Sequence, residues 1–204
     1  SLSERTAFII NDGKSKNFNT DSLEIYFQNG YFFKDSKLKK MNLSKNFTTM
    51  YNGGLKTIFV HKNKKFAFIS SNKDKCFYAS IVMIGNGEEL FKTQCLSSEK
   101  LDFNGLGSSH IHHNGQILLS IGAPEQASSE IRELAQDQNS FFGKIVEIDK
   151  NDLDKIINGT KNEIIPKIYT LGHRNPQGLT KIKDSLFSVE HGPKGGDELN
   201  KIIK

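Results

Sequence analysis

The chain has 204 residues, 36% of them apolar, with fifteen Phe, five Tyr and no Trp, which suits a folded soluble domain with a core built on Phe and Ile. The formal charge of +5 does not indicate a nucleic-acid site, because the Lys residues are scattered and the richest patch, Lys34 to Lys45, lacks interleaved aromatic or Arg side chains. No apolar run reaches the roughly eighteen residues that span a bilayer, which excludes a membrane span.

Short β-rich runs follow one another along almost the whole chain, separated by turn clusters rich in Asn and Gly. The predicted strand segments are 6–10, 23–34, 55–71, 76–84, 89–96, 108–122, 142–150, 164–171 and 184–192. Hairpins at regular spacing favour an all-β sandwich, barrel or propeller. One helix is predicted at 128–139, as an insertion in a loop. A second short helical turn is predicted at 151–159, and it ends in a Gly that suits a left-handed cap.

The strands fall into groups of roughly forty to fifty residues, which is the length of a four-stranded propeller blade. These groups run over 53–96, 108–149 and 167–192. We therefore expect a single all-β propeller domain over 1–204 that holds about four blades. The chain stops at 197–204, where another strand is expected to begin. We therefore expect either a domain that is incomplete at its C-terminus or terminal strands that close the ring unconventionally.

Two cysteines lie in strand-like runs on either side of a Gly-rich turn. Antiparallel pairing around Gly85 and Asn86 would place Cys76 and Cys95 roughly opposite each other. A disulfide is therefore feasible and would suit an exported, periplasmic protein. The alternative is a pair of unbonded, half-buried thiols. Residues 1–7 lack the pattern of a signal peptide, and the absence of an initial Met is consistent with a leader that was removed or left out.

The stretch "GHRNPQG", residues 172–178, concentrates polar groups in a rigid loop. Gly172 and Gly178 allow backbone conformations closed to other residues, and Pro176 restricts Asn175 before it. Arg174 adds a planar cationic fork. A stiff loop that holds a guanidinium and amides suits an anionic, planar, oxygen-rich ligand. The alternative is an Arg that pairs with a carboxylate of a neighbouring blade.

A second polar stretch, "SVEHGPKGGDELN", covers residues 188–200. A Gly-Pro turn exposes backbone carbonyls, and the carboxylates of Glu190, Asp197 and Glu198 lie nearby in the sequence. Such oxygens are suitable ligands for a hard cation such as Ca²⁺. By itself the pattern is also that of an ordinary turn.

Taken together and in this order, the two stretches resemble the soluble pyrroloquinoline quinone (PQQ)-dependent sugar dehydrogenases, the glucose/sorbosone dehydrogenase family of six-bladed β-propellers. The similarity extends upstream through "GGLKTIFVHKNKKFAFISS", "GQILLSIG" and "FFGKIVEIDK". It covers about residues 52 to 203, and nothing before Tyr51 is diagnostic. The pair of C-terminal stretches carries most of the resemblance.

The resemblance implies that PQQ lies on one face of the propeller, held by a Ca²⁺ ion and by arginine and amide side chains. Arg174 matches the family's arginine, which contacts the quinone oxygens and stabilises negative charge as the cofactor is reduced. Asn175 matches a cofactor-contacting amide, and we add Gln177 and Asn52 to the expected cofactor contacts. Gly192 and Pro193 match the pair whose backbone carbonyls bind the Ca²⁺ ion.

The family's catalytic base has no match in the simplest register. Where the family has a histidine that takes the proton from the sugar, ungapped alignment places Asn104, and Ala123 replaces a supporting aspartate. An amide cannot act as that base. A shifted register would bring His110 or His112 over the cofactor instead. The same two histidines are also half of a transition-metal site that lacks a third ligand.

The sequence therefore supports a quinoprotein oxidoreductase that transfers hydride from a sugar or polyol to PQQ and passes electrons to an acceptor. The alternative is a propeller that binds PQQ, a sugar or a partner after losing its base. A propeller hydrolase of the lactonase type would need Glu, Asn and Asp ligands from separate blades, and these motifs are not seen. The substrate and the oligomeric state stay open, with a homo-oligomer as one option.

Overall fold

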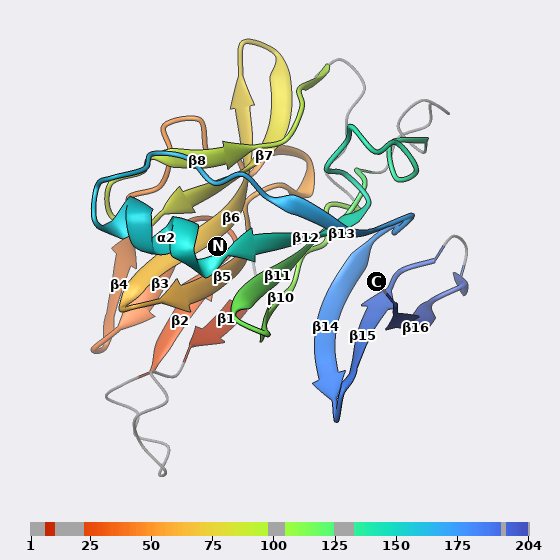
Figure 1. Ribbon diagram of the computed structural model, residues 1–204. Helices are drawn as coiled ribbons and strands as arrows, with labels where there is room; N and C mark the ends of the chain where they lie inside the picture. Colours follow the sequence, from red (N-terminus) through yellow and green to blue (C-terminus); the bar gives the residue numbers. More distant parts are fainter. Residues whose placement is uncertain (1–6, 11–22, 98–104, 125–132, 193–194, 204) are drawn as a thin grey trace.

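The computed structural model describes residues 7–10, 23–97, 105–124, 133–192 and 195–203. Its strands form four antiparallel sheets in chain order (Figure 1). The first sheet contains β1 (Ala7–Ile10), β2 (Glu24–Phe27), β3 (Tyr31–Lys34) and β4 (Lys37–Lys40). The second contains β5 (Leu55–His61), β6 (Lys64–Lys73), β7 (Cys76–Met83) and β8 (Glu89–Lys92), with β9 (Leu96–Ser97) paired to β7.

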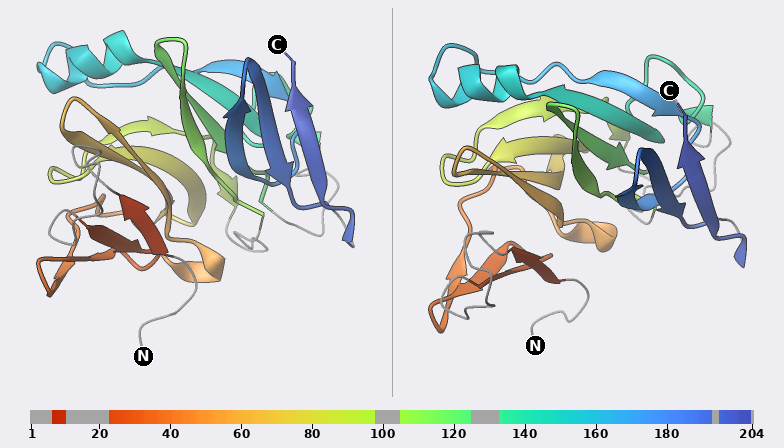
Figure 2. Two further views of the ribbon diagram at one scale, coloured as in Figure 1. Left: turned by 90° about the horizontal axis from the view of Figure 1, so that it is seen from below. Right: turned by 60° about the horizontal axis from the view of Figure 1, so that its bottom comes forward.

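The third sheet contains β10 (His110–His113), β11 (Gln116–Ile121), β12 (Lys144–Asp149) and β13 (Lys167–Leu171). The fourth contains β14 (Pro176–Ile182), β15 (Ser185–Glu190) and β16 (Glu198–Ile202). Successive sheets lie beside one another like neighbouring blades (Figure 2). The all-β prediction and the arrangement in propeller-type blades are therefore confirmed, with four sheets as expected.

Apolar side chains between the sheets hold the blades together. The largest cluster lies between the second and third sheets and includes Phe59, Phe68 and Val146. A second cluster joins the first two sheets, and a third, with Leu118 and Leu186, joins the last two. The inner strands of the second and third sheets (β6, β7, β11 and β12) are buried on both faces, because they pack against the blades before and after them. The core is rich in Phe and Ile, as the composition indicates.

Some boundaries differ from the predicted ones. β4 and β14 fall outside the predicted segments, and β16 lies where a further strand is expected at the end of the chain. β13 pairs with β12, so it closes the third sheet and does not open the fourth. The strand pattern alone could not make this distinction, because β13 and β14 are separated only by the short loop 172–175.

The two helical predictions have different outcomes. The second corresponds to α2 (Lys150–Ile157), where the Asp149 side chain caps the first turn and Gly159 follows with a φ of +72°. The first, at 128–139, lies partly outside the described residues; its described part begins with Glu133 in a helical conformation and continues as turns from 134 onwards. Within the described residues, no helix is long and apolar enough to cross a membrane.

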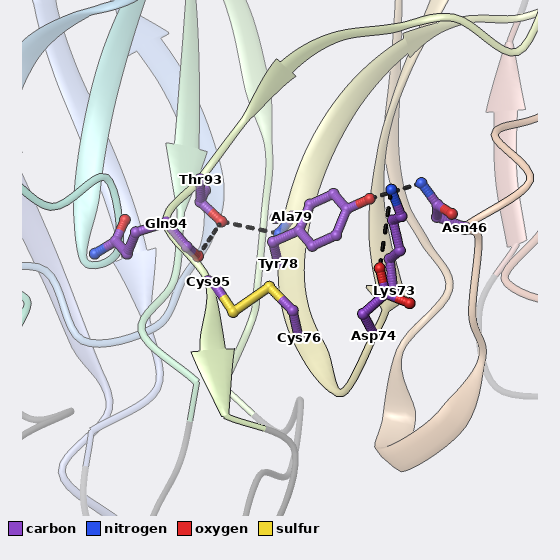
Figure 3. The surroundings of a disulfide bond; sticks show 9 residues. All are labelled: Asn46, Lys73, Asp74, Cys76, Tyr78, Ala79, Thr93, Gln94 and Cys95. Carbon is purple, nitrogen blue, oxygen red and sulfur yellow. Dashed lines mark hydrogen bonds and ion pairs between the residues drawn. A yellow bond between two sulfur atoms is a disulfide. The ribbon is translucent and has the colours of Figure 1, made fainter.

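The two cysteines are bonded (Figure 3). Cys76 at the start of β7 and Cys95 just before β9 form a disulfide, with their Cα atoms 5.3 Å apart. Next to it, the Ala79 amide donates to Thr93 Oγ1 at 2.9 Å, which keeps the chain beyond β8 against β7. Of the two alternatives left by the sequence, the structure contains the disulfide.

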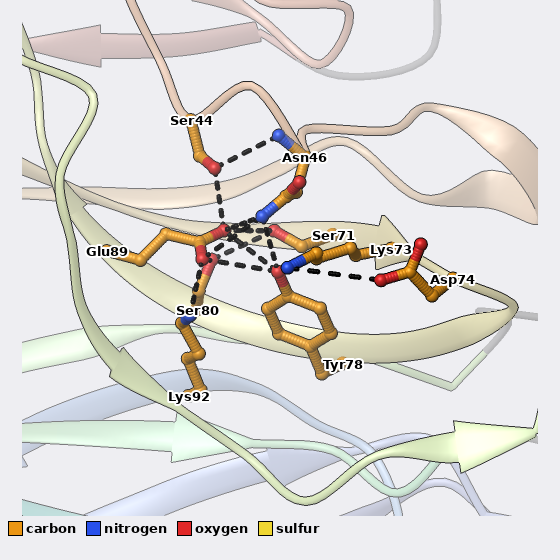
Figure 4. Close-up of polar contacts among 9 residues, drawn as sticks. All are labelled: Ser44, Asn46, Ser71, Lys73, Asp74, Tyr78, Ser80, Glu89 and Lys92. Atoms are coloured by element: carbon orange, nitrogen blue, oxygen red, sulfur yellow. Dashed lines mark hydrogen bonds and ion pairs between the residues drawn. The ribbon is translucent and has the colours of Figure 1, made fainter.

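A buried carboxylate joins the second sheet to the segment before it (Figure 4). Glu89 accepts hydrogen bonds from the Ser44 hydroxyl at 2.6 Å and from Tyr78, and it pairs with Lys92 at 2.9 Å. Burial alone would raise the pKa of Glu89, but these donors outweigh it and lower the pKa. Burial and the neighbouring carboxylate raise the pKa of Tyr78 to about 12. The cluster therefore holds a negative charge inside the fold at neutral pH.

A second buried carboxylate makes stability sensitive to acid. Burial would raise the pKa of Glu24, but hydrogen bonds from Lys34, Lys65 and Tyr26 outweigh it and lower the pKa from 4.5 to about 2. The charged Glu24 carboxylate therefore stabilises the folded state fully above pH 4.5, and this contribution is lost as the pH falls through 2. We expect Glu24 to contribute on the order of 2 kcal/mol of this acid-sensitive stability.

Urea unfolding at pH 7 and pH 3 tests this prediction. The Glu24→Gln variant removes the titrating group, so it should lose less stability than the wild type between the two pH values. Equal losses in both proteins would contradict the assignment.

Candidate functional site

The loop between β13 and β14 carries the first polar stretch. Gly172 has a φ of +90°, a left-handed conformation that favours glycine, and its amide donates to the Ala135 carbonyl at 2.8 Å. The next amide, of His173, donates to the Gly143 carbonyl at 3.0 Å. Pro176 then begins β14 opposite Glu190. The loop is thus held at its start by the segment 135–143 of the third blade and at its end by β15 of the fourth.

One buried carboxylate organises this loop from within. Glu190, at the end of β15, accepts a hydrogen bond from His173 Nδ1 at 2.6 Å and another from the Arg174 amide at 3.2 Å. His173 Nε2 bonds to Thr170 Oγ1 at 2.8 Å. Burial would raise the pKa of Glu190, but the bond from His173 and its other polar neighbours lower it. Glu190 is therefore a carboxylate at neutral pH.

Arg174 connects the first polar stretch to the second. Its guanidinium donates from Nη1 to the His191 carbonyl at 2.9 Å, and its own carbonyl accepts from the Ala123 amide at 2.8 Å. The side chain is half-buried. The two stretches that the sequence analysis singles out therefore meet at Arg174.

The second stretch folds back on itself around Asp197. Asp197 Oδ1 bonds to His191 Nδ1 at 3.1 Å and accepts from the Gly192 amide at 3.2 Å. The bond from His191 lowers the pKa of Asp197. Only glycine fits at 192, because a Cβ there would lie 1.6 Å from the Gly196 carbonyl oxygen. The turn is thus tightly closed beside the guanidinium.

A hollow of about 490 Å³ lies against this junction. Its wall includes Arg174, Glu190, His191, Gly192 and Lys201. A second hollow of about 390 Å³ is lined by Gln177, His191 and Asp197, among others. His191 borders both hollows, although it is not among the predicted site residues. It lies there because it directly precedes Gly192 and pairs with Asp197.

This junction lies within the part of the chain that matches a known family. Residues 84–204 match the family model described as glucose/sorbosone dehydrogenase. The chain belongs to the glucose/sorbosone dehydrogenase family. The match covers both polar stretches and the whole third and fourth sheets. The family resemblance of the sequence is thereby confirmed.

Three curated proteins illustrate the relationship. The chain is 37% identical to quinoprotein glucose dehydrogenase B of Acinetobacter calcoaceticus over 70 residues, and this match covers 34% of the chain and 15% of that protein. It is 34% identical to aldose sugar dehydrogenase YliI of Escherichia coli over 95 residues, a match that covers 42% of the chain and 23% of that protein. An uncharacterised Synechocystis protein, slr1608, is 36% identical over 97 residues, covering 43% and 24%. Each match spans less than a quarter of the relative's length, and no solved structure matches significantly.

The amides expected at the cofactor site of this dehydrogenase family have different surroundings. Asn175 is buried, and its Oδ1 accepts from the Gly107 amide at 2.7 Å, so this oxygen binds the protein's own backbone. Gln177 is exposed beside the second hollow. Asn52 is exposed before β5, where its carbonyl accepts from Gln28 Nε2 at 3.1 Å and from Lys56 Nζ. Asn175 is thus a structural link between blades as well as an expected cofactor contact.

The two histidines predicted as proton acceptors, His110 and His112, lie on β10 of the third sheet. His110 lies between the second and third sheets, and its Nδ1 bonds to Thr57 Oγ1 at 3.0 Å. Burial, and to a smaller extent His112, lower the pKa of His110 to about 4. Burial also lowers the pKa of His112. Asn104 lies outside the described residues, and Ala123 is buried.

The two predicted metal sites, the histidine pair on β10 and the Ca²⁺ site at the Gly-Pro turn, also have different outcomes. Among the described residues, no group of three or more His, Cys, Asp or Glu side chains is placed to hold a metal ion, so His110 and His112 have no third ligand there. The calcium prediction uses backbone carbonyls instead. It stays a prediction, because Gly192 is described and Pro193 lies outside the described residues.

Proposed function

We propose that the protein is a quinoprotein oxidoreductase that uses PQQ to oxidise a sugar or a related polyol. The observation that carries the proposal is the meeting of Arg174 with the His191–Gly192 turn beside a hollow of about 490 Å³. Membership of the glucose/sorbosone dehydrogenase family supports it, as does the similarity to quinoprotein glucose dehydrogenase B and to an aldose sugar dehydrogenase.

The residues of the junction fit a planar, multiply charged cofactor with a divalent ion. The half-buried Arg174 guanidinium is positioned by the His191 carbonyl and borders the hollow, where it would bind quinone or carboxylate oxygens. The close approach of Gly196 to Gly192 leaves backbone without side chains beside it, where the Gly192 carbonyl would contribute to a Ca²⁺ site. When bound, PQQ would supply a two-electron acceptor for hydride from the sugar.

Arg174 would act as an electrostatic catalyst. A guanidinium stays charged at any working pH, so it would stabilise the negative charge that develops on the acceptor oxygens. Its effect depends on being held in place before the reaction begins. The bonds from Arg174 to Glu190 and His191 supply that preorganisation. Export to an oxidising compartment such as the periplasm agrees with the Cys76–Cys95 disulfide and is part of the proposal.

A second candidate is a propeller that binds PQQ or a sugar without turnover. The observation that favours it is the position of His110, whose Nδ1 is engaged by Thr57 between two sheets. A base with a pKa near 4 is poorly matched to proton removal at neutral pH. Either His112 or a group outside the described residues would then have to take the proton.

Reconstitution with PQQ and Ca²⁺, followed by dye reduction with a series of aldoses, separates the two candidates. Dye reduction that depends on PQQ and on an aldose supports the oxidoreductase. Saturable PQQ binding without dye reduction supports the binding protein. Absence of PQQ binding in the correctly folded protein would refute both.

The Arg174→Ala variant should weaken PQQ binding about 10- to 100-fold, because it removes charge-assisted hydrogen bonds to the cofactor. Arg174→Lys should give an intermediate loss, since a point charge cannot reproduce the planar fork. Quenching of intrinsic fluorescence during a PQQ titration would measure both affinities.

Lys181→Ala is a suitable control, because it removes an equal charge from an exposed position on β14. It should leave the affinity unchanged. A loss in the Lys181 variant as large as in the Arg174 variants would indicate a general effect of charge and would contradict the assignment.

A further inference from the structure

The Glu190 carboxylate accepts more hydrogen bonds than a simple ion pair requires. Oε1 bonds to His173 Nδ1 at 2.6 Å, to the Ser188 hydroxyl at 2.8 Å and to the Asn200 side-chain amide at 3.2 Å. Oε2 accepts from the Arg174 backbone amide at 3.2 Å. The residue is only 6% exposed. One buried group thus connects β15, β16 and the loop that carries Arg174.

Arg174 is held at both ends by consecutive residues. Its backbone amide bonds to the Glu190 side chain, and its guanidinium bonds to the carbonyl of the following residue, His191. The loop position before it is fixed as well, because His173 bridges Glu190 and Thr170. The direction in which the Arg174 side chain leaves the backbone therefore depends on where the Glu190 carboxylate lies.

We propose that Glu190 is a positioning residue that acts through Arg174, setting the orientation of the guanidinium at the hollow. This inference rests on the proposed function, since it assumes that Arg174 binds the cofactor. Glu190 itself need not touch the cofactor: its oxygens are engaged by protein donors. His173 shares the task by linking the same carboxylate to β13.

The chemistry of the carboxylate makes a sharp substitution available. A carboxylate accepts hydrogen bonds at both oxygens, whereas the Gln side chain has one acceptor and one donor end. In a Glu190→Gln variant, the NH₂ end of the new side chain would face one of two groups of donors. One is the Arg174 backbone amide, and the other is the set formed by His173, Ser188 and Asn200. One of the two connections is therefore lost although the size of the side chain is kept.

A double-mutant cycle on PQQ affinity tests the inference. Glu190→Gln alone should weaken PQQ binding about tenfold, and it should add little when Arg174→Ala is already present. A purely structural role would weaken binding by the same factor in both backgrounds. Asp184→Asn is the control: it removes a carboxylate from the exposed turn between β14 and β15, outside both hollows, where Asp184 pairs with Lys181 at 4.0 Å. It should leave the affinity within about twofold of the wild type.

The outcomes separate this inference from the proposed function. If Arg174→Ala itself leaves PQQ affinity unchanged, the proposed function fails and the inference fails with it. If Arg174→Ala weakens binding but Glu190→Gln does not, or if the two effects multiply, the inference alone is overturned.

A measurement on the unsubstituted protein covers the case in which Glu190→Gln does not fold. An amide bonded to a buried carboxylate should exchange its hydrogen slowly, so the Arg174 amide should be protected in the cofactor-free protein. Thr170→Val, which removes only the outer link to His173, should lower that protection measurably. Rapid exchange of the Arg174 amide in the wild type would overturn the inference without any reference to activity.

Discussion

The Lys144→Met variant is expected to lose about 3 kcal/mol of stability, because it removes the donor for a set of buried carbonyls. Lys144 is fully buried at the start of β12, and its Nζ donates to the carbonyls of Leu134, Ala135 and Phe142 at 2.8 to 2.9 Å. Burial lowers its pKa to about 8. Methionine would fill the space, but at least two carbonyls would be left without a partner at about 1–3 kcal/mol each.

The same substitution should reach the Arg174 loop. The Ala135 carbonyl accepts from Lys144 and also from the Gly172 amide, so Lys144 positions the segment on which the loop rests. We expect faster hydrogen exchange at Gly172 and at His173, together with a lower urea midpoint. Lys155→Met, on the exposed face of α2, is the control and should change stability by no more than about 0.5 kcal/mol. Equal midpoints for the two variants would show that the three carbonyl bonds contribute nothing.

Removal of the disulfide should have an effect of similar size. The bond links residues 19 positions apart, and closing a loop of that length in the unfolded chain is worth about 3 kcal/mol. A Cys76→Ser, Cys95→Ser double variant should therefore unfold at lower urea than the wild type. Its midpoint should not respond to a reducing agent, whereas the wild type should fall to nearly the same value when it is reduced.

A wild-type midpoint that is insensitive to reduction would contradict this prediction. The expected loss is largest in the chain beyond β8, because Cys95 is the covalent link between that segment and β7. Hydrogen exchange of the Ala79 amide, which bonds to Thr93 Oγ1 in this segment, reports on that local effect.

Much of the fold could be predicted because its turns are local. The clusters at Gly30, Asn63 and Gly115 adopt positive φ values between paired strands, as their residue types indicate. β14 was harder to predict, because Pro176 and Gly178 disfavour a strand and the pattern of burial is weak. Its pairing with β15 supplies the order that the local sequence lacks.

The candidate site, like the fold, has some contacts that the local sequence predicts and others that it does not. Arg174 and Gly192 could be predicted as neighbours, because each lies in a distinctive stretch and only one hairpin separates them. The bond from Gly107 to Asn175 joins residues 68 positions apart, and no local pattern predicts it. The hydrogen bond between Glu190 and His173 also depends on register, because the two side chains meet only once β14 and β15 are paired.

A crystal structure of the protein grown with PQQ and Ca²⁺ would test the central claim most directly. The account predicts a planar cofactor in the hollow, with its oxygens within hydrogen-bonding distance of the Arg174 guanidinium and a Ca²⁺ ion on the Gly192 carbonyl. A cofactor bound elsewhere, or an empty hollow at concentrations that saturate binding in solution, would contradict it.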